Sequence, residues 1–218
     1  LKDMDNTGTL EAEKKMDLYA GKDIRMTADT HREENGQGHT TAISKRGAAS
    51  VTGKESSLTM TAGKDIHLQA ARISSAGDMT IAGKRQVELG TAVAEKDNRV
   101  TWDRSNDRRD STAMETGSTL TAGRNLTVEN GKEITDLEEH HRHKEKGLLS
   151  SKTTTTYDEV KRTDTTGSIV EGDTLTMTAG KDISLTGSVA ASTKETALSA
   201  GRNISIHAAE ETDKEIHK

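Results

Sequence analysis

The sequence has no cysteine, no proline and no phenylalanine, and aromatic residues make up only 1% of its 218 positions. Without cysteine, the chain forms neither a disulfide framework nor a reactive thiolate. No apolar run approaches the ~20 residues that a transmembrane helix needs, and no signal peptide is visible. The net charge of −5 gives the chain no general attraction to nucleic acid or to an anionic membrane.

Hydrophobic residues are also few, at 30% of the chain against 31% charged residues. This balance is typical of disordered chains, so disorder is one interpretation. The other is a narrow core of small aliphatic side chains, because Leu, Ile, Val and Met recur in a regular alternation that a disordered tract does not need. We favour the second. Since the chain starts in mid-pattern at Leu1, it is expected to be a piece of a longer protein.

One phrase recurs along the chain and is clearest at residues 57–69, SLTMTAGKDIHLQ. Leu58 and Met60 alternate with threonines, and Ile66 and Leu68 alternate with polar residues. A period of two predicts two half-buried β-strands. The glycine between them suits a tight corner, and the Asp or Asn two places later tolerates the left-handed conformation.

Six glycines mark the copies of this phrase, and we assign them to one corner of a repeating unit: Gly21, Gly63, Gly83, Gly123, Gly180 and Gly201. Their separations are 42, 20, 40, 57 and 21 residues, which predicts a unit of about 20 residues. Such units cannot bury an apolar face alone, so they are expected to stack as coils. The predicted fold is therefore all-β, a parallel β-helix with an expected right-handed winding.

Three polar stretches interrupt the units, at about residues 28–50, 91–115 and 134–165. Each is predicted to be a β-hairpin that leaves the rod and contributes to a side sheet. The chain is expected to return through a Thr-Gly pair each time, at residues 52–53, 116–117 and 166–167. A rod of nine coils without hairpins is the less favoured alternative. The whole chain, 1–218, is predicted to be a single repeat domain.

Two columns of polar residues follow from this alignment. The first is a basic ridge, with Lys64 over Lys84 and Lys181 over Arg202; its members are Lys22, Lys64, Lys84, Arg124, Lys181 and Arg202. Such a ridge would attract phosphates or acidic glycans, but a solvated corner that discourages aggregation is the favoured interpretation. The second column contains Asp23, Asp65, Asn125, Asp182 and Asn203, and it is predicted to be a turn device. The Gly-Gly-x-Gly-x-Asp motif of repeat-type calcium loops is absent.

The histidines His140, His141 and His143 lie in the longest interruption, and the last two would share one face of a strand. Zinc binding is one hypothesis, but Arg142 and Lys144 crowd the cluster with positive charge and no acid follows at a recognisable ligand spacing. A polar hairpin limb is the favoured interpretation. Because histidine changes charge near neutral pH, a pH-responsive limb is a further hypothesis.

Exposed anchors are the last candidates. Trp102 lies among charged residues, and Leu148 and Leu149 follow a glycine; these side chains either contact a partner or pack back on the rod. The two tyrosines, Tyr19 and Tyr157, lie on distant segments and form no aromatic platform for a sugar. No paired carboxylates, catalytic triad or phosphate-binding loop stands out. We therefore predict no catalytic, metal-binding or cofactor-binding residue, and no enzyme.

The repeated TAGKDI phrase, its TAGRNL variant at residues 121–126, and the segment KGLLSSKTTTT at residues 146–156 carry a resemblance when taken together. They resemble the haemagglutinin repeats of filamentous haemagglutinins and of CdiA-like proteins of contact-dependent growth inhibition. The resemblance covers nearly the whole chain. It implies export by two-partner secretion and a long β-helical filament at the bacterial surface, associated with the outer membrane.

Filaments of that family serve adhesion, or they present and deliver a C-terminal toxin. The resemblance therefore implies a shaft segment, whose partners are neighbouring coils of the same filament and the envelope of a target cell. The alternative is an adhesin surface that binds host glycans or proteins. Insertions that gather on one side of a repeat protein suit both functions.

Overall fold

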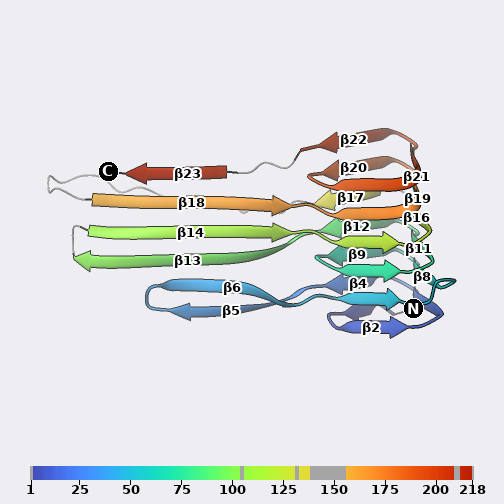
Figure 1. Cartoon of the computed structure of the whole chain (residues 1–218), viewed down its shortest axis with the longest axis horizontal. Helices are drawn as coiled ribbons and strands as arrows, with labels where there is room; N and C mark the ends of the chain where they lie inside the picture. The colour runs from blue at the N-terminus through green and yellow to red at the C-terminus, as the bar shows by residue number, and fades with distance from the viewer. Residues whose placement is uncertain (1, 104–105, 131–132, 138–155, 209–211, 218) are drawn as a thin grey trace.

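The computed structural model describes residues 2–103, 106–130, 133–137, 156–208 and 212–217. The strands form a rod of stacked coils and a side sheet that extends from one side of the rod (Figure 1). Every regular element in these ranges is a strand, as the period-two alternation predicts. None of the described residues belongs to a helix long and apolar enough to cross a membrane.

The rod has three faces of mostly parallel strands. The first face contains β2 (Thr9–Ala12), β7 (Ala48–Val51), β10 (Arg72–Ser75), β15 (Thr119–Ala122) and the first halves of β19 (Ile169–Ala179) and β21 (Val189–Ala200). The second contains β3 (Lys15–Ala20), β8 (Ser57–Ala62), β11 (Asp78–Gly83), β16 (Asn125–Asn130) and the second halves of β19 and β21. The third contains β1 (Met4–Asn6), β4 (Ile24–Thr27), β9 (Asp65–Gln69), β12 (Gln86–Gly90), β17 (Glu133–Leu137), β20 (Asp182–Thr186) and β22 (Asn203–His207). The predicted all-β parallel β-helix is confirmed, and its winding hand stays a prediction.

One coil without a hairpin takes 21 residues. Met60 lies beside Ile81 in the ladder of β8 and β11, and Ala179 lies beside Ala200 in that of β19 and β21. Because the period is two, every second side chain points inward, and Leu58, Met60 and Ile81 are fully buried. The seven strands of the third face, at about 4.8 Å each, give a rod roughly 30 Å long.

The side sheet has six strands in the order β23-β18-β14-β13-β6-β5. They are β5 (Asp29–Asn35), β6 (Gly38–Lys45), β13 (Ala92–Asp103), β14 (Asn106–Thr116), β18 (Thr156–Thr166) and β23 (Thr212–His217). β5 and β6 form one antiparallel hairpin, and β13 and β14 form another. β14 and β18 pair in parallel, because both return toward the rod.

The strands of the side sheet and the coils of the rod have the same spacing. β5, β13 and β23 follow β4, β12 and β22 along the chain, whereas β6, β14 and β18 lead into β7, β15 and β19. At about 4.8 Å per strand, a two-stranded hairpin occupies the height of two coils. The turns from β9 to β10 and from β20 to β21 carry no hairpin, and this leaves room for the returning strands β6 and β18.

All hairpins leave from the corner between the third and the first face, where a serine ladder connects the coils. The N–H of Ser118 donates to Ser168 Oγ at 3.1 Å, and the N–H of Ser168 donates to Ser188 Oγ at 3.1 Å. Ser118 Oγ accepts from the Ala71 N–H at 3.1 Å and donates to the Leu68 carbonyl at 2.7 Å. These buried hydrogen bonds tie the hairpin roots to the coils, because a buried polar group without a partner is costly.

Two of the six glycines, Gly83 and Gly123, are wrongly assigned to the common corner. Gly83 lies beside Ala62, so Lys84 occupies the place equivalent to Gly63. Gly123 lies at the corner between the first and second faces, where its N–H donates to the Ser75 carbonyl at 2.8 Å. The alignment failed because similar Ala-Gly phrases occur at two different corners.

The boundaries of the hairpins also differ from the predictions. The first hairpin returns at Gly47, since β7 begins at Ala48, and residues 52–53 form the next corner instead. Ile134 pairs with both Val87 and Ile183 in the rod, so the predicted start of the third excursion at residue 134 is too early. Residues 138–155 lie outside the described part.

Gly63 lies at a point of the second-to-third corner that leaves no room for a side chain. Its N–H donates to the Ala20 carbonyl at 2.9 Å, and a Cβ added to it would lie 2.3 Å from the carbonyl oxygen of Gly21. A Cβ never comes so close to a backbone oxygen, so a larger residue must push two stacked coils apart.

We expect Gly63→Ala to lower the free energy of unfolding by about 1–3 kcal/mol, the usual cost of overpacking a close contact. Urea unfolding followed by far-ultraviolet circular dichroism measures it. Gly36→Ala is the matched control, because a Cβ there would meet nothing within 4 Å. Equal losses in the two variants would contradict this account of the corner.

Asp65 stabilises the same corner through a buried carboxylate, whose side chain is 3% exposed. Arg85 of the next coil donates to it from Nε at 2.8 Å and also from Nη2. The hydrogen bond with Arg85 lowers the pKa of Asp65 from its ordinary value near 3.8, although burial acts in the opposite direction. The ionised form is therefore the one that the fold stabilises.

A depressed pKa contributes stability above the unfolded value of about 3.8, and this contribution is lost as the pH falls through the folded pKa. We expect Asp65→Asn to lower the urea midpoint at pH 7, and the difference from the wild type to shrink below about pH 4. Asp173→Asn, which removes a more exposed carboxylate paired with Lys194, is expected to change the midpoint little. A difference that stays constant from pH 7 to pH 3 would exclude the ion pair as its cause.

Candidate binding groove and surface charges

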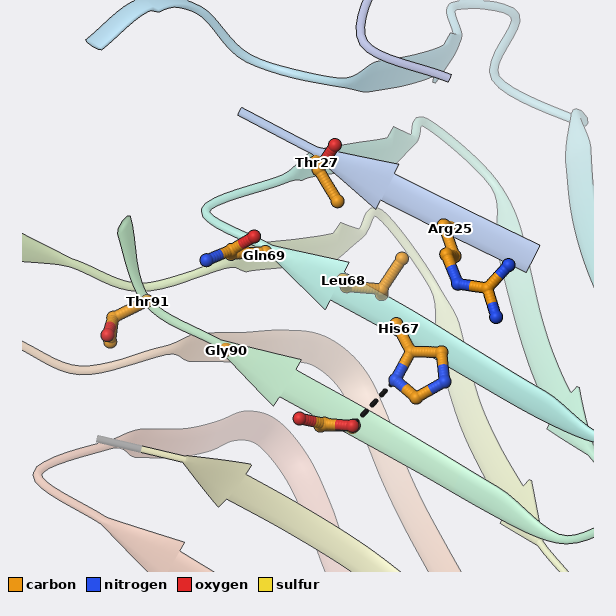
Figure 2. Close-up of a pocket in the computed structure, with 8 residues that line it drawn as sticks. Arg25, Thr27, His67, Leu68, Gln69, Gly90 and Thr91 are labelled. Carbon is orange, nitrogen blue, oxygen red and sulfur yellow. Dashed lines mark hydrogen bonds and ion pairs between the residues drawn. The ribbon is translucent and has the colours of Figure 1, made fainter. Parts of the chain in front are cut away.

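A groove with a volume of about 240 Å³ lies on the outer side of the third face, where the second hairpin begins (Figure 2). It crosses three coils, because its lining comes from β4, β9 and β12. The lining residues are Arg25, Thr27, His67, Leu68, Gln69, Glu88, Gly90 and Thr91.

Stacking of the coils sets the arrangement of the polar side chains. Arg25, His67 and Glu88 are successive partners in the ladder, so they form one row across the face. His67 Nδ1 and Glu88 Oε2 are 2.6 Å apart (Figure 2), and the Nε2 atom of the same ring lies 4.0 Å from Asp65 Oδ2. Arg25 Nη2 lies 2.6 Å from Asp23 Oδ2. The charges of this row are therefore paired within the rod.

Thr91 is the unusual member of the lining. It is 2% exposed, and its hydroxyl oxygen has no hydrogen-bond partner in the part of the chain that the structure describes. Gly90 and Thr91 lie where the chain passes from the rod into β13. Buried hydroxyls are normally satisfied, so this one marks an imperfectly packed point at the hairpin root.

The chemistry of the groove suits binding better than catalysis. The row of Arg25, His67 and Glu88 offers guanidinium, imidazole and carboxylate groups, which recognise polar ligands. Both ring nitrogens of His67 face carboxylates. The described hydrogen bond of this imidazole is to Glu88 and not to either hydroxyl of the lining, Thr27 or Thr91, so no nucleophile is paired with it there. Among the described residues, no group of three or more histidine or acidic side chains is placed to hold a metal ion.

The predicted basic ridge is only partly present. Lys22, Lys64 and Arg85 stack at one corner, with N–H to carbonyl distances of 2.8 Å and 2.7 Å between successive members. The predicted contact of Lys64 with Lys84 is wrong, whereas Lys181 does lie next to Arg202.

Carboxylates neutralise part of this ridge. Arg85 binds Asp65, and Arg202 binds Asp182, so the corner does not present an unbroken positive surface. The hydrogen bond from Arg202 lowers the pKa of Asp182, although burial opposes it. Arg124 lies at the other corner, where its Nη2 is 2.8 Å from Asp78 Oδ2.

At the positions that are in register, the Asp and Asn column connects successive coils and does not adopt the predicted left-handed conformation, since Ala70 is the only described non-glycine residue with a positive φ. Asp23 Oδ1 accepts from the Asp65 N–H at 3.3 Å, and Asp182 Oδ1 accepts from the Asn203 N–H at 3.1 Å. Asn125 does not belong to this column, since it hydrogen-bonds Asp78 at the other corner. Carboxylates of this column connect successive coils.

The remaining predicted residues are placed as follows. His140, His141, His143, Leu148 and Leu149 lie outside the described residues, and the side chain of Trp102 is not described. Tyr19 is 71% exposed on the outer side of the second face. Sequence reasoning missed the groove, because its residues come from three coils and only the ladder register brings them together.

Comparison with known proteins indicates which family this chain is similar to. A family model described as the hemagglutinin repeat matches residues 147–218. The tRNA nuclease CdiA of Escherichia coli strain STEC_O31 is 26% identical over 90% of this chain and 7% of its own length. The 16S rRNA endonuclease CdiA of Enterobacter cloacae is 37% identical over 43% of this chain and 3% of its own length.

The chain thus spans less than a tenth of each of these relatives, and no solved structure matches it. The similarity to the Escherichia coli protein extends over most of the coils and hairpins described above. The hemagglutinin-repeat match, the two relatives and the stacked coils agree. Together they support a region of the filamentous haemagglutinin and CdiA-like type, with the hemagglutinin repeat at residues 147–218.

Proposed function

We propose that this region is a non-catalytic shaft segment of a large bacterial surface filament, exported by two-partner secretion. The filament presents a C-terminal toxin and delivers it to neighbouring cells. The two relatives are named as nucleases, and this region matches only 7% and 3% of their lengths. In this proposal the nuclease is a separate part of the parent protein, and the coils hold it away from the cell surface.

The observation that supports a shaft most directly is the continuous register of the rod. Ile24, Ile66, Val87, Ile134 and Ile183 follow one another in a single column of the third face. Each apolar row is buried by the next coil, so stability depends on neighbours along one axis. A rod of this kind extends by adding coils, which is what a spacer requires.

The second candidate function is adhesion, and the groove together with the side sheet favours it. The hairpins project from one corner and expose polar strands, with β5 exposed along its whole length. An adhesin would use these surfaces to bind host glycans or proteins. The shaft function needs the rod alone, so the two functions separate when hairpins and coils are removed independently.

A hairpin and the two coils that give it room can be deleted together without changing the register, since Gly83 lies beside both Ala62 and Asn130. We expect deletion of residues 63–130 from the parent protein to leave both surface display and killing of neighbouring cells within about twofold of wild type, because the coils on either side stack on each other. Killing is measured in co-culture, at display levels matched by antibody labelling.

The comparison variant removes a hairpin and keeps the coils. Residues 91–118 are replaced by Ala-Ala, which copies the turn at Ala70 and Ala71 where β9 passes directly to β10. A shaft retains killing after this change as well. Killing or adherence that disappears at matched display would contradict the shaft function and favour the adhesin.

A further inference from the structure

Two arginines at the root of the first hairpin differ from the other described arginines. Within the described ranges, Arg46 and Arg72 have no hydrogen bond or ion pair to any acidic group, whereas other arginines there are paired, such as Arg25 with Asp23. Arg46 is half-buried and Arg72 is exposed. In a chain with a net charge of −5, two neighbouring cations without a carboxylate are unexpected.

The ladder register places the two arginines together. Arg72 begins β10 and lies beside Ala48, and its N–H donates to the Gly47 carbonyl at 3.0 Å. Arg46 precedes Gly47 directly, between β6 and β7. Ile73 is fully buried, so Arg72, its neighbour in the strand, points outward.

The electrostatics of Arg46 agree with this geometry. Burial lowers the pKa of Arg46, and the positive charge of Arg72 lowers it further. No carboxylate counteracts these two effects. A partly buried guanidinium is normally compensated by an acid, because leaving it unpaired costs free energy. The structure therefore retains a charge that a bound anion would compensate.

Hydroxyl groups continue the surface next to the pair. Ser74 lies two residues after Arg72 in β10, about 7 Å away, and Ser50 of β7 is its partner in the ladder. Residues two apart in a strand share a face, so these hydroxyls lie on the same outer face as Arg72. The surface thus offers two guanidinium forks followed by a row of hydroxyls.

We propose that Arg46 and Arg72 form a binding site for one phosphate or sulfate ester group carried on a sugar. Each guanidinium presents a planar fork of donors that matches an oxyanion, and two forks together hold one such group. The hydroxyls of Ser50 and Ser74 bind the sugar that carries it. This site is independent of the shaft function, since neither arginine contributes to the apolar stacking of the coils.

A sugar suits the surface better than a phospholipid bilayer. The chain carries a net charge of −5, which repels an anionic membrane, and the two strands present serines next to the pair. A single ester on a soluble sugar needs only the local positive charge. Bilayer binding therefore becomes an outcome of the test.

The test uses the 218-residue chain, titrated with glucose 6-phosphate and with inorganic phosphate at constant ionic strength. The Nε–Hε signals of Arg46 and Arg72 in ¹⁵N-labelled protein are expected to shift together, with a dissociation constant on the order of 1 mM. Glucose 6-phosphate is expected to bind at least about threefold tighter than inorganic phosphate, because the serines contact the sugar. Arg46→Gln and Arg72→Gln are each expected to weaken binding about tenfold or more.

Arg124→Gln is the matched control, since Arg124 lies in an ion pair with Asp78 away from the site, and it should bind like the wild type. Without ligand, Arg46→Gln should unfold at the same or a higher temperature, because it relieves the repulsion from Arg72. Binding that is equal in Arg46→Gln and wild type would overturn the site. A loss of stability in Arg46→Gln without ligand would overturn it too, since the arginine would then be structural.

A final comparison separates the two sources of a phosphate group. Vesicles of phosphatidylglycerol and phosphatidylcholine are added to the wild type and to the double variant Arg46→Gln/Arg72→Gln. Sedimentation of neither protein with the vesicles supports the sugar. Sedimentation of the wild type alone would overturn it in favour of a membrane.

Discussion

The spacing of hydrogen-bonded β-strands, about 4.8 Å, is the constraint on which the rest of this structure depends. It sets the rise of each coil, and it also sets the width of the side sheet, because every coil from β4 to β22 has one strand of that sheet beside it. A hairpin has two strands and therefore needs the height of two coils. Coils that carry a hairpin must therefore be accompanied by coils with a direct turn, which provide the height that the second strand of the hairpin needs.

The coil interior was predictable from the sequence, because one simple rule governs it. Inward positions such as Leu58, Met60 and Ile66 must be apolar, and they recur with a period of two, so strands of the second and third faces could be predicted. The short strands of the first face, such as β10, were not predicted. The corners were less predictable. Gly63 and Gly123 stand in almost identical phrases, yet they occupy different corners, since both lie where two backbones approach closely and leave no room for a side chain.

The groove and the arginine pair could not be predicted, for a related reason. Arg25, His67 and Glu88 are separated by long stretches of sequence, and Arg46 and Arg72 are divided by a complete coil. Their proximity follows from the register and from hairpin lengths that no local pattern encodes. Charged residues in the phrase itself, such as Asp65 and Asp182, pair with Arg85 and Arg202 of the next coil and therefore connect coils.

The direct turn at Ala70 and Ala71 has a consequence for how such filaments change over time. Ala70 has a φ of 48°, a left-handed conformation that Asn and Gly adopt more readily, so this turn is compact but strained. β10 follows this turn directly, whereas β15 follows a whole hairpin. The two strands nevertheless lie side by side in the same ladder. Loss of a hairpin at this corner, or gain of one together with the coil that gives it room, leaves the phase of all later coils unchanged. Surface features can thus be exchanged by recombination between genes, while the rod that carries them is inherited intact.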